Sequence, residues 1–257
     1  MAKRVALIVQ ARMGSTRLPG KILMPLKGKP MLGWQLERLK RAKELDQIIL
    51  ATTDTKGDDA VAALGETCGV TVFRGDEDDV LDRYYRAAKE AGADIIVRVT
   101  GDCPLTDPAV VDEVVRHFRS ANVDYTKHPE NYPEGLDTEV FSFDALERVW
   151  REAKLPSERE HVTPFIRNHP ELFRVDAPWT SGDISRPTYH WSVDTANDFK
   201  FIEAICEHMD TDTFSMRDVI ALLERHPEFL EINKGGTGYE GLEKSQKEDK
   251  EFKKRHG

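Results

Sequence analysis

The chain has 257 residues, in which 46 Asp and Glu residues outnumber 37 Lys and Arg residues and give a formal charge of -9. This acidic balance argues against sequence-independent binding to nucleic acid as the main role, so any phosphate site must be local. Hydrophobic residues make up 39% and charged residues 32% of the chain. This composition is typical of a soluble globular protein, and no apolar stretch is long enough to span a membrane.

In chain order, apolar runs of strand length alternate with segments of helical periodicity through the first half. This alternation is typical of an α/β domain with a Rossmann-like, mostly parallel sheet flanked by helices. We predict strands over residues 5–10, 47–51, 70–73, 94–99 and 123–125. We predict helices over residues 30–39, 58–67, 80–91 and 108–118.

The rhythm changes after residue 126, where a loop rich in Pro, Gly and Asn precedes a predicted strand at 138–143. We interpret this change as an insertion and expect four regions. Ser157 and Glu160 predict a capping box for a helix ending near Asn168. A strand at 189–193 and helices over 196–208 and 215–224 then restore the pattern. The regions are a nucleotide-binding core (1–126), an insertion (127–185), a return to the core (186–232) and a loosely held C-terminal arm (233–257).

The first apolar run is shorter than the core of a signal peptide, and no small-residue cleavage site follows it. The three cysteines lie far apart, so neither a disulfide framework nor a zinc cluster is indicated. Both observations favour a cytoplasmic protein.

A dense basic loop, residues 11–21, follows the first predicted strand at the sheet edge where α/β proteins bind ligands. Arg12, Arg17 and Lys21 are suited to the charges of a triphosphate, and glycines such as Gly14 let backbone N–H groups approach the oxygens. The spacing matches neither a P-loop nor Gly-x-Gly-x-x-Gly. The alternative is an ordinary basic turn with a Pro-Gly bend.

Two aspartates follow predicted strands at the same edge. Asp102 comes after the strand at 94–99, with Gly101 leaving room for a bulky ligand, and Asp194 comes after the strand at 189–193. Carboxylates beside phosphate oxygens are typical Mg²⁺ ligands, so we expect a Mg²⁺ site. The alternative is that Asp194 caps the following helix and Asp102 caps a turn.

The run Arg-x-x-Ser-Thr-Arg-Leu-Pro-Gly-Lys at 12–21 resembles the N-terminal signature of the cytidylyltransferases that activate acidic sugars. The chain is similar to the 3-deoxy-manno-octulosonate and acylneuraminate enzymes, and most similar to the SpsF-type spore-coat polysaccharide branch. Further matching motifs lie at 74–84, 100–105, 134–139, 160–164 and 193–195. The fold implied is that of nucleotide-diphospho-sugar transferases, and the cytosine preference comes from the resemblance alone.

The resemblance implies transfer of CMP from CTP to an acidic sugar or a phosphorylated small acceptor, with release of pyrophosphate, in surface polysaccharide biosynthesis. Lys21, Asp102 and Asp194 would be the catalytic residues, with Mg²⁺ held by the two aspartates. The nucleotide-binding candidates are Ala11, Arg12, Gly14, Ser15, Arg17, Lys21 and Arg74.

The acceptor candidates lie in or near the insertion and are Asp137, Glu139, His161 and Arg186. The resemblance also implies a homodimer built by this region. His161 and Glu139 have a structural alternative as packing or dimer-contact residues.

Two other classes of function stay open. A sugar-1-phosphate nucleotidylyltransferase would carry a Gly-x-Gly opening, and a metal-dependent glycosyltransferase an Asp-x-Asp motif, and the sequence has neither at the matching place. A non-catalytic nucleotide-binding or assembly subunit would be expected to lose the loop lysine or an aspartate, and here all are present.

Overall fold

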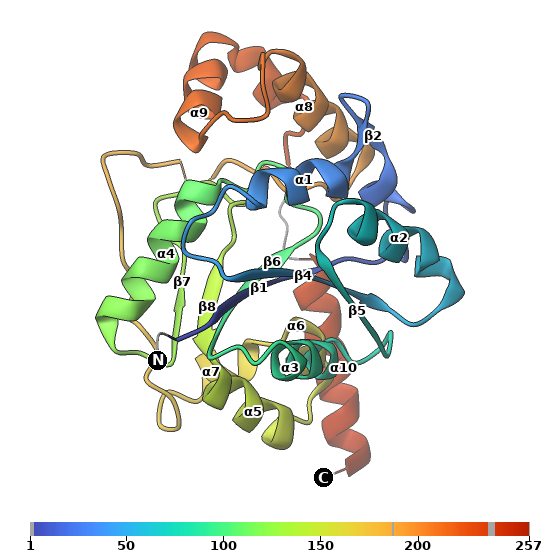
Figure 1. Cartoon of the computed structure of the whole chain (residues 1–257), viewed down its shortest axis with the longest axis vertical. Coiled ribbons are helices and arrows are strands. Elements are labelled where there is room, and N and C mark those ends of the chain that lie inside the picture. Colours follow the sequence, from blue (N-terminus) through green and yellow to red (C-terminus); the bar gives the residue numbers. More distant parts are fainter. Residues whose placement is uncertain (1–2, 187, 236–239, 257) are drawn as a thin grey trace.

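The computed structural model describes residues 3–186, 188–235 and 240–256. Within these ranges, strands form one mixed sheet in the order β5-β4-β1-β6-β8-β7 (Figure 1). The central β1 pairs in parallel with β4 and β6, and β4 pairs in parallel with β5, whereas β8 runs antiparallel between β6 and β7. The predicted α/β fold with a mostly parallel sheet is confirmed. The strands are β1 (Val5–Gln10), β4 (Gln47–Thr53), β5 (Thr71–Gly75), β6 (Ile95–Thr100), β7 (Tyr125–Lys127) and β8 (Glu139–Ser142).

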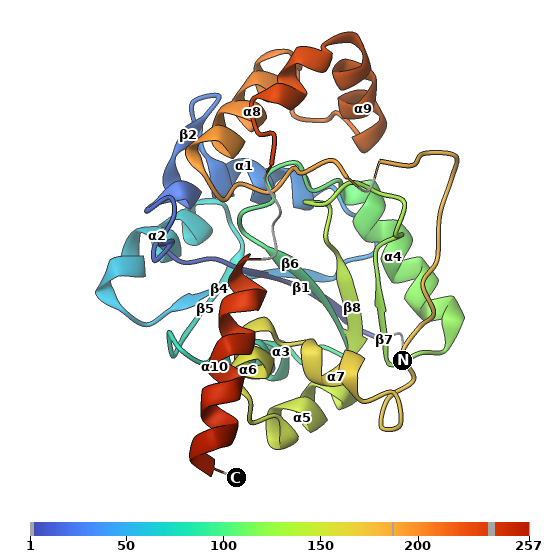
Figure 2. The same ribbon diagram turned by 180° about the vertical axis from the view of Figure 1, so that it is seen from behind.

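Helices cover both faces of the sheet (Figures 1 and 2). One face packs on α1 (Met31–Leu39), α2 (Asp59–Thr67) and α4 (Pro108–Ala121). The other packs on α3 (Val80–Glu90), α5 (Phe143–Glu152), α6 (Pro156–His161) and α7 (Pro164–Asn168). A two-strand ribbon, β2 (Pro25–Leu26) with β3 (Lys29–Pro30), precedes α1. Short 3-10 turns are η1 (Lys21–Leu23), η2 (Lys56–Asp58) and η3 (Pro227–Glu231).

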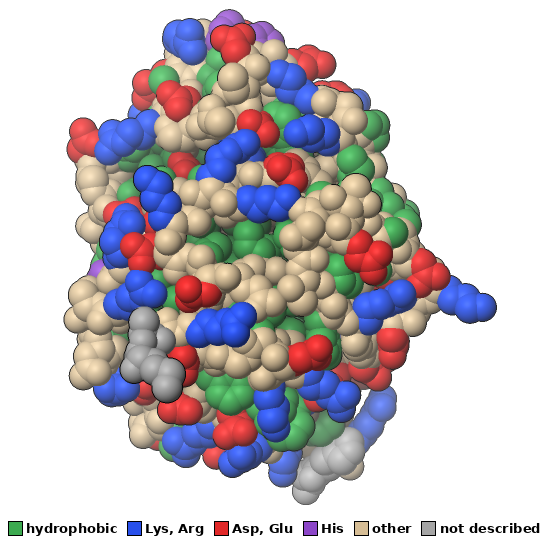
Figure 3. Space-filling view, in the orientation of Figure 1, with side chains coloured by type: hydrophobic (Ala, Val, Ile, Leu, Met, Phe, Trp, Pro, Cys, Tyr) green, Lys and Arg blue, Asp and Glu red, His purple; other side chains and the backbone are tan. Residues whose placement is uncertain are grey.

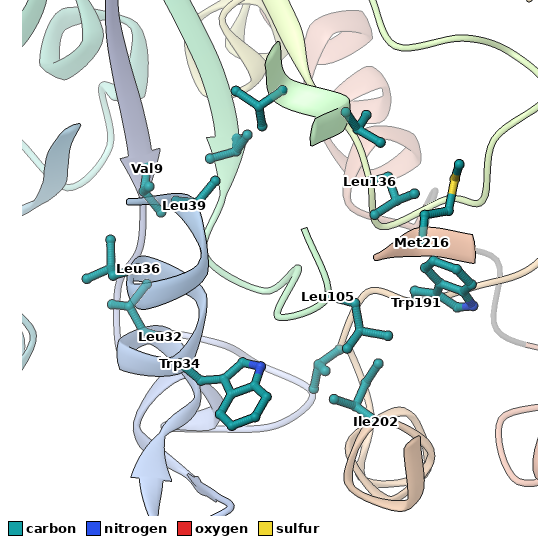
Figure 4. Close-up of a cluster of buried hydrophobic side chains, with 14 of the residues drawn as sticks. Val9, Leu32, Trp34, Leu36, Leu39, Leu105, Leu136, Trp191, Ile202 and Met216 are labelled. Carbon is teal, nitrogen blue, oxygen red and sulfur yellow. The ribbon is translucent and has the colours of Figure 1, made fainter. Parts of the chain in front are cut away.

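The sheet separates two hydrophobic clusters because side chains alternate between the faces of a strand. Leu7 and Val9 of β1 belong to the cluster under α1 and α4, and Ile8 belongs to the cluster under α3 and α5. The first cluster continues to Ile202 of α8 (Ala196–Glu207) and to α9 (Met216–Arg225), beyond α1 (Figure 4). The central strand is therefore buried on both sides, as its continuous apolar run indicates.

The strand expected at 138–143 outside the repeating pattern is β8, and it lies inside the main sheet. The strand expected at 123–125 begins later, at Tyr125. Asn122 ends α4 in the left-handed conformation, with φ 52°, and Asp124 then donates its N–H to the carbonyl of Arg174. The chain therefore joins the sheet only after this turn.

The strand predicted at 189–193 is wrong. This segment makes one isolated bridge, between Glu134 and His190, and is otherwise irregular, with a bend at Ser192. Its backbone donors pair with loop residues instead of a neighbouring strand: Trp191 donates to Glu134 and Val193 donates to Asp102. A buried apolar run is compatible with either arrangement, so periodicity does not separate them.

The capping box predicted at Ser157 is also wrong. The helix begins at Pro156, and Glu158 accepts from the backbone N–H groups of Lys154 and Leu155. The helix then breaks at Val162, where φ is +68°, and α7 starts at Pro164. Pro164 has no backbone N–H to bond to a carbonyl of the preceding turn, which accounts for two short helices in place of one.

The C-terminal arm forms a helix, α10 (Glu240–His256), which lies beside α6 (Figure 2). Ser245 is fully buried, and Asp249 accepts from both the N–H and the hydroxyl of Ser157. The part of the predicted arm at 236–239, and Gly257, lie outside the described residues. The described helix is thus anchored by polar contacts to the 127–185 region.

The surface carries mixed charge. On the face seen in Figure 3, Lys and Arg side chains are interspersed with Asp and Glu side chains. None of the helices within the described ranges combines the length and apolar character that a membrane span requires.

Candidate active site

The basic loop leaves β1 at the carboxyl end of the sheet and folds back on itself. Ala11 still donates to the carbonyl of Ala51, and Met13 donates to Oδ1 of the buried Asp58 at 2.7 Å. Gly20 adopts φ +72°, which favours glycine, and donates to the carbonyl of Met13. This bend turns the chain into η1 and sends the side chain of its first residue, Lys21, inward.

The ammonium of Lys21 contacts groups from two distant parts of the sequence. Nζ is 2.9 Å from Oδ2 of Asp102, 3.1 Å from Oδ1 of Asp194, and donates to the carbonyl of Val193 at 2.6 Å. The guanidinium of Arg17 reaches the same oxygen of Asp194 at 2.9 Å. The structure therefore brings together the three predicted catalytic residues and one nucleotide-binding candidate.

Lys21 and Asp102 hold each other ionised. Burial alone lowers the pKa of Lys21, but Asp102 and Asp194 outweigh burial and raise that pKa above its ordinary value. Burial likewise raises the pKa of Asp102, but Lys21, together with hydrogen bonds from the Thr100 side chain and the backbone, outweighs burial and lowers that pKa. The ammonium of Lys21 and the carboxylate of Asp102 are therefore the stable forms near neutral pH.

Backbone contacts fix the two aspartates relative to each other. Val193 donates its N–H to the carbonyl of Asp102 at 2.8 Å, so the chain entering Asp194 is tied to the loop after β6. The cap of α8 is the hydroxyl of Thr195, which accepts from the N–H of Asp198. The helix-capping alternative for Asp194 is therefore excluded, and its carboxylate is used by Lys21 and Arg17 instead.

Gly101 has a different role from the one expected. A Cβ at this position would lie 2.7 Å from Cβ of Ala11 and 3.0 Å from the carbonyl oxygen of Gln10. The space beside Gly101 is thus occupied by the start of the basic loop, not left for a ligand. Small residues at 11 and 101 let the loop and the Asp102 turn lie close together.

The two carboxylates fit a divalent cation. Both direct an oxygen at one cationic atom, Lys21 Nζ, so they already converge on a single position. Within the described ranges, no group of three or more His, Cys, Asp or Glu side chains is placed to hold a metal ion with protein ligands alone. Two carboxylates supplemented by phosphate oxygens and water suit Mg²⁺, which is seldom bound by protein ligands alone.

The remaining nucleotide-binding candidates line the loop and its neighbours. Arg12 pairs with Glu77 at 3.1 Å, and 40% of its side chain is exposed. The hydroxyl of Ser15 accepts from the backbone of the loop at 3.3 Å, and Gly14 lies against Glu77 and Arg12. Arg74 donates to the carbonyl of Thr53 at the end of β4 and to that of Thr55 in the following loop, and pairs with Asp59. Arg74 thus holds that loop, and its nucleotide role stays a prediction.

Glu139 is saturated by contacts within the protein. It pairs with Arg98 at 2.6 Å and accepts from the hydroxyls of Tyr125 and Thr163, at 2.5 and 2.7 Å. Burial raises the pKa of Glu139, but Arg98, Arg167 and the hydroxyls of Tyr125 and Thr163 together outweigh burial and lower that pKa. These contacts join β6, β7, β8 and the start of α7, which supports the structural alternative for this residue.

The other acceptor candidates do not gather around one point. Asp137 accepts from the N–H of Gly135 at 2.8 Å, and His161 bonds through Nε2 to the hydroxyl of Ser245 on α10 at 3.0 Å. Arg186 pairs with a glutamate of α9 at 2.7 Å. These contacts lie in three different parts of the fold, so an acceptor role for each of them stays a prediction.

Comparison with known proteins supplies the family. Residues 6–244 match the family described as cytidylyltransferase. The chain belongs to the cytidylyltransferase family. This family member is 43% identical over 226 residues to an uncharacterized protein of Methanocaldococcus jannaschii, covering 88% of this chain and 93% of the other. It is 35% identical over 230 residues to the spore coat polysaccharide biosynthesis protein SpsF of Bacillus subtilis, covering 87% and 95%.

A solved structure agrees with this membership. The structure of a cytidylyltransferase from Leptospira borgpetersenii matches with a TM-score of 0.83 and 33% identity, and covers 93% of this chain and all of the other. The sequence resemblance to SpsF-type cytidylyltransferases is therefore confirmed.

Two residues that shape the site of this cytidylyltransferase family member, Asp58 and Arg83, were given no role from the sequence, although Arg83 lies in the matching motif at 74–84. The sequence predicts Asp58 only as the start of a helix, yet its carboxylate accepts from the backbone N–H of Met13 and so fixes the basic loop. Arg83 is buried and donates to the carbonyl of Asp76, which orders the chain around Glu77. A buried charged residue on an amphipathic helix was the available signal, because such a residue needs a specific partner.

Proposed function

We propose that this chain transfers CMP from CTP to an acidic sugar or a phosphorylated small acceptor and releases pyrophosphate. The observation that carries the proposal is the convergence of Lys21, Asp102 and Asp194 at the carboxyl edge of the sheet, next to the basic loop. Membership of the cytidylyltransferase family and similarity to SpsF support CTP as the donor and surface polysaccharide biosynthesis as the setting.

In the proposed reaction an acceptor oxygen attacks the α-phosphorus of CTP, and the bond from that phosphorus to the bridging oxygen of pyrophosphate breaks. Pyrophosphate leaves with the electron pair of that bond. An acceptor phosphate is already anionic and requires no general base, whereas a sugar hydroxyl must lose its proton. Such transfer depends mainly on positioned charge, because the protein forms no covalent bond.

The basic residues and the aspartates of the site have separate roles. Arg12, Arg17 and Lys21 bind the triphosphate and offset the negative charge that grows on the leaving pyrophosphate. Asp102 and Asp194 would hold Mg²⁺, and a bound Mg²⁺ would neutralise phosphate charge and orient the reacting oxygens. Lys21 lies between the two carboxylates and keeps them in place.

The test is pyrophosphate release by the purified chain with CTP, Mg²⁺ and a panel of acidic sugars and phosphorylated small acids. We expect release with at least one acceptor and a CMP-linked product by mass spectrometry. Silence across a broad panel, with CTP still bound, would favour the non-catalytic subunit. Equal rates with the other nucleoside triphosphates would contradict the donor assignment.

Two variants separate the roles within the cluster. Asp102→Asn is expected to lower kcat about 100-fold or more while CTP affinity changes less, whereas Lys21→Ala is expected to reduce both. Asp183→Asn is the matched control, because 88% of its side chain is exposed and its partner is Arg217 on the surface. Unchanged kcat in Asp102→Asn would remove the carboxylate from the mechanism.

A further inference from the structure

His190 lies on the chain segment that leads to Asp194, and its imidazole bridges two carboxylates from other segments. Its Nδ1 is 2.7 Å from Oε2 of Glu134, and its Nε2 is 3.7 Å from Oδ1 of Asp198. Only 10% of the His190 side chain and 3% of the Asp198 side chain are exposed. The imidazole therefore joins a loop residue before β8 to the first turn of α8.

Asp198 connects His190 to the backbone of Asp194. Its other oxygen, Oδ2, accepts from the backbone N–H groups of Asp194 and Thr195, at 3.1 and 2.7 Å, and from the hydroxyl of Thr195. The two oxygens of Asp198 are thus divided: one meets His190, and the other fixes the backbone that carries Asp194. A shift of Asp198 moves the donors that set the direction of the Asp194 carboxylate.

Glu134 holds the same segment from the opposite side. Its N–H donates to the carbonyl of Tyr189, and its carbonyl accepts from Trp191, so the two segments run side by side. Gly135 presses against this contact, since a Cβ there would lie 2.6 Å from the backbone of Trp191. Leu136 and Trp191 belong to one buried cluster, which fixes the base of the arrangement (Figure 4).

We propose that His190 is a positioning residue that holds Asp194 in place through Asp198 and Glu134. The inference rests on the proposed function for its link to catalysis, and on the contacts alone for its link to the Asp194 backbone. Among the described residues, the His190 side chain pairs with Glu134 and Asp198 and not with Lys21, so we assign it no direct part in the reaction. Substituting a residue that orients a metal ligand without touching the metal typically lowers activity by about 10- to 100-fold.

The electrostatics agree with an imidazolium bridge. Burial by itself lowers the pKa of His190, but Glu134, Asp198 and Asp194 outweigh it and raise that pKa above its ordinary value. Because both ring nitrogens of the charged form are donors, one side chain serves two carboxylates. A neutral amide in its place has donors on one nitrogen only.

The experiment compares three substitutions at one position. His190→Leu removes both contacts, His190→Gln places an amide near Nε2, and His190→Asn places one near Nδ1. We expect His190→Leu to lower kcat by about 10- to 100-fold with a smaller change in KM for CTP. We expect His190→Gln to recover more activity than His190→Asn, because the route to Asp194 runs through Asp198.

A second readout does not depend on catalysis. Hydrogen exchange of the backbone amides of Asp194 and Thr195, followed by NMR, is expected to be faster in His190→Leu and slower again in His190→Gln. If the wild-type chain releases no pyrophosphate, the proposed function fails and the amide exchange alone decides the positioning role. If His190→Leu does not fold, the comparison of the Gln and Asn variants decides it.

His117→Leu is the matched control. His117 lies 2.6 Å from Asp176 and stacks on Trp179, with ring centroids 3.9 Å apart, on another part of the surface. It should lose stability without changing kcat or the exchange of the two amides. Unchanged amide exchange in His190→Leu, unchanged kcat in an active enzyme, or better recovery by Asn than by Gln would each overturn the proposal.

Discussion

Replacing Lys21 by methionine tests how the charge cluster is held together. Only 10% of the Lys21 side chain is exposed. Methionine keeps most of the buried aliphatic part and removes the ammonium from between Asp102 and Asp194. The two carboxylates then face each other, with Arg17 still paired to Asp194. The protein must accommodate two like charges that lysine had neutralised.

The magnitude follows from the two distances. Ion pairs at 2.9 and 3.1 Å are each worth about 5 kcal/mol of Coulomb energy at an effective dielectric constant of about 20. Desolvation offsets much of this gain, and breaking a buried pair typically costs about 3–5 kcal/mol. Asp102 is 29% exposed and Arg17 stays beside Asp194, so we expect a loss of roughly 2–4 kcal/mol. In a chain of this size that corresponds to a fall in Tm of roughly 4–16 °C.

The assay is thermal unfolding with and without millimolar Mg²⁺ and no nucleotide. Because the variant leaves the position between the carboxylates to another cation, Mg²⁺ should stabilise Lys21→Met more than the wild type. At about 100 times its Kd, a ligand that binds only the folded state adds about 2.7 kcal/mol. Lys40→Met is the control, since Lys40 makes an ordinary surface pair with Glu37 and should change stability by at most about 1 kcal/mol.

Two results would refute this reasoning. A Tm of Lys21→Met equal to or above that of the wild type would mean that the ammonium does not stabilise the cluster. An equal Mg²⁺ effect on both proteins would mean that the carboxylates of Asp102 and Asp194 do not form the cation position.

Gly135→Ala should cost about 3 kcal/mol in urea unfolding, because its Cβ would meet the backbone of Trp191 at 2.6 Å and φ is +90°. Gly92→Ala is its control, with φ +61° and no atom within 4 Å, so equal losses in both variants would show that the close approach contributes nothing. His161 is expected to reduce stability in acid: burial lowers its folded pKa below the ordinary 6.5, so the stability present above 6.5 is lost as pH falls through the folded value. His161→Gln should therefore show a flatter Tm profile than the wild type between about pH 7.5 and 5.5, and parallel profiles would contradict this.

The regular part of the fold could be predicted because local patterns decide it. The first strand was predicted at the bounds that the structure gives, Val5–Gln10, and the helix at Pro108 begins where proline and the Asp107 cap require. These features depend on neighbours within a few residues, so the sequence contains them directly. The failure at 189–193 arises because two distant residues, Glu134 and Asp102, pair with that segment. At 157, Glu158 caps the helix locally, and the Ser157 hydroxyl bonds to Asp249 of α10 instead.

For the site, the amino-acid sequence by itself determined which residues carry the charge: a basic loop after the first strand, an aspartate after β6, and Asp194 before a capped helix. Only the tertiary structure decided that Lys21 reaches both aspartates, that Gly101 makes room for Ala11, and that His190 pairs with Asp198. The physical reason is distance along the chain. Charge and periodicity are properties of short segments, whereas a contact between residues 81 or 173 positions apart exists only after the sheet has brought their strands and loops together.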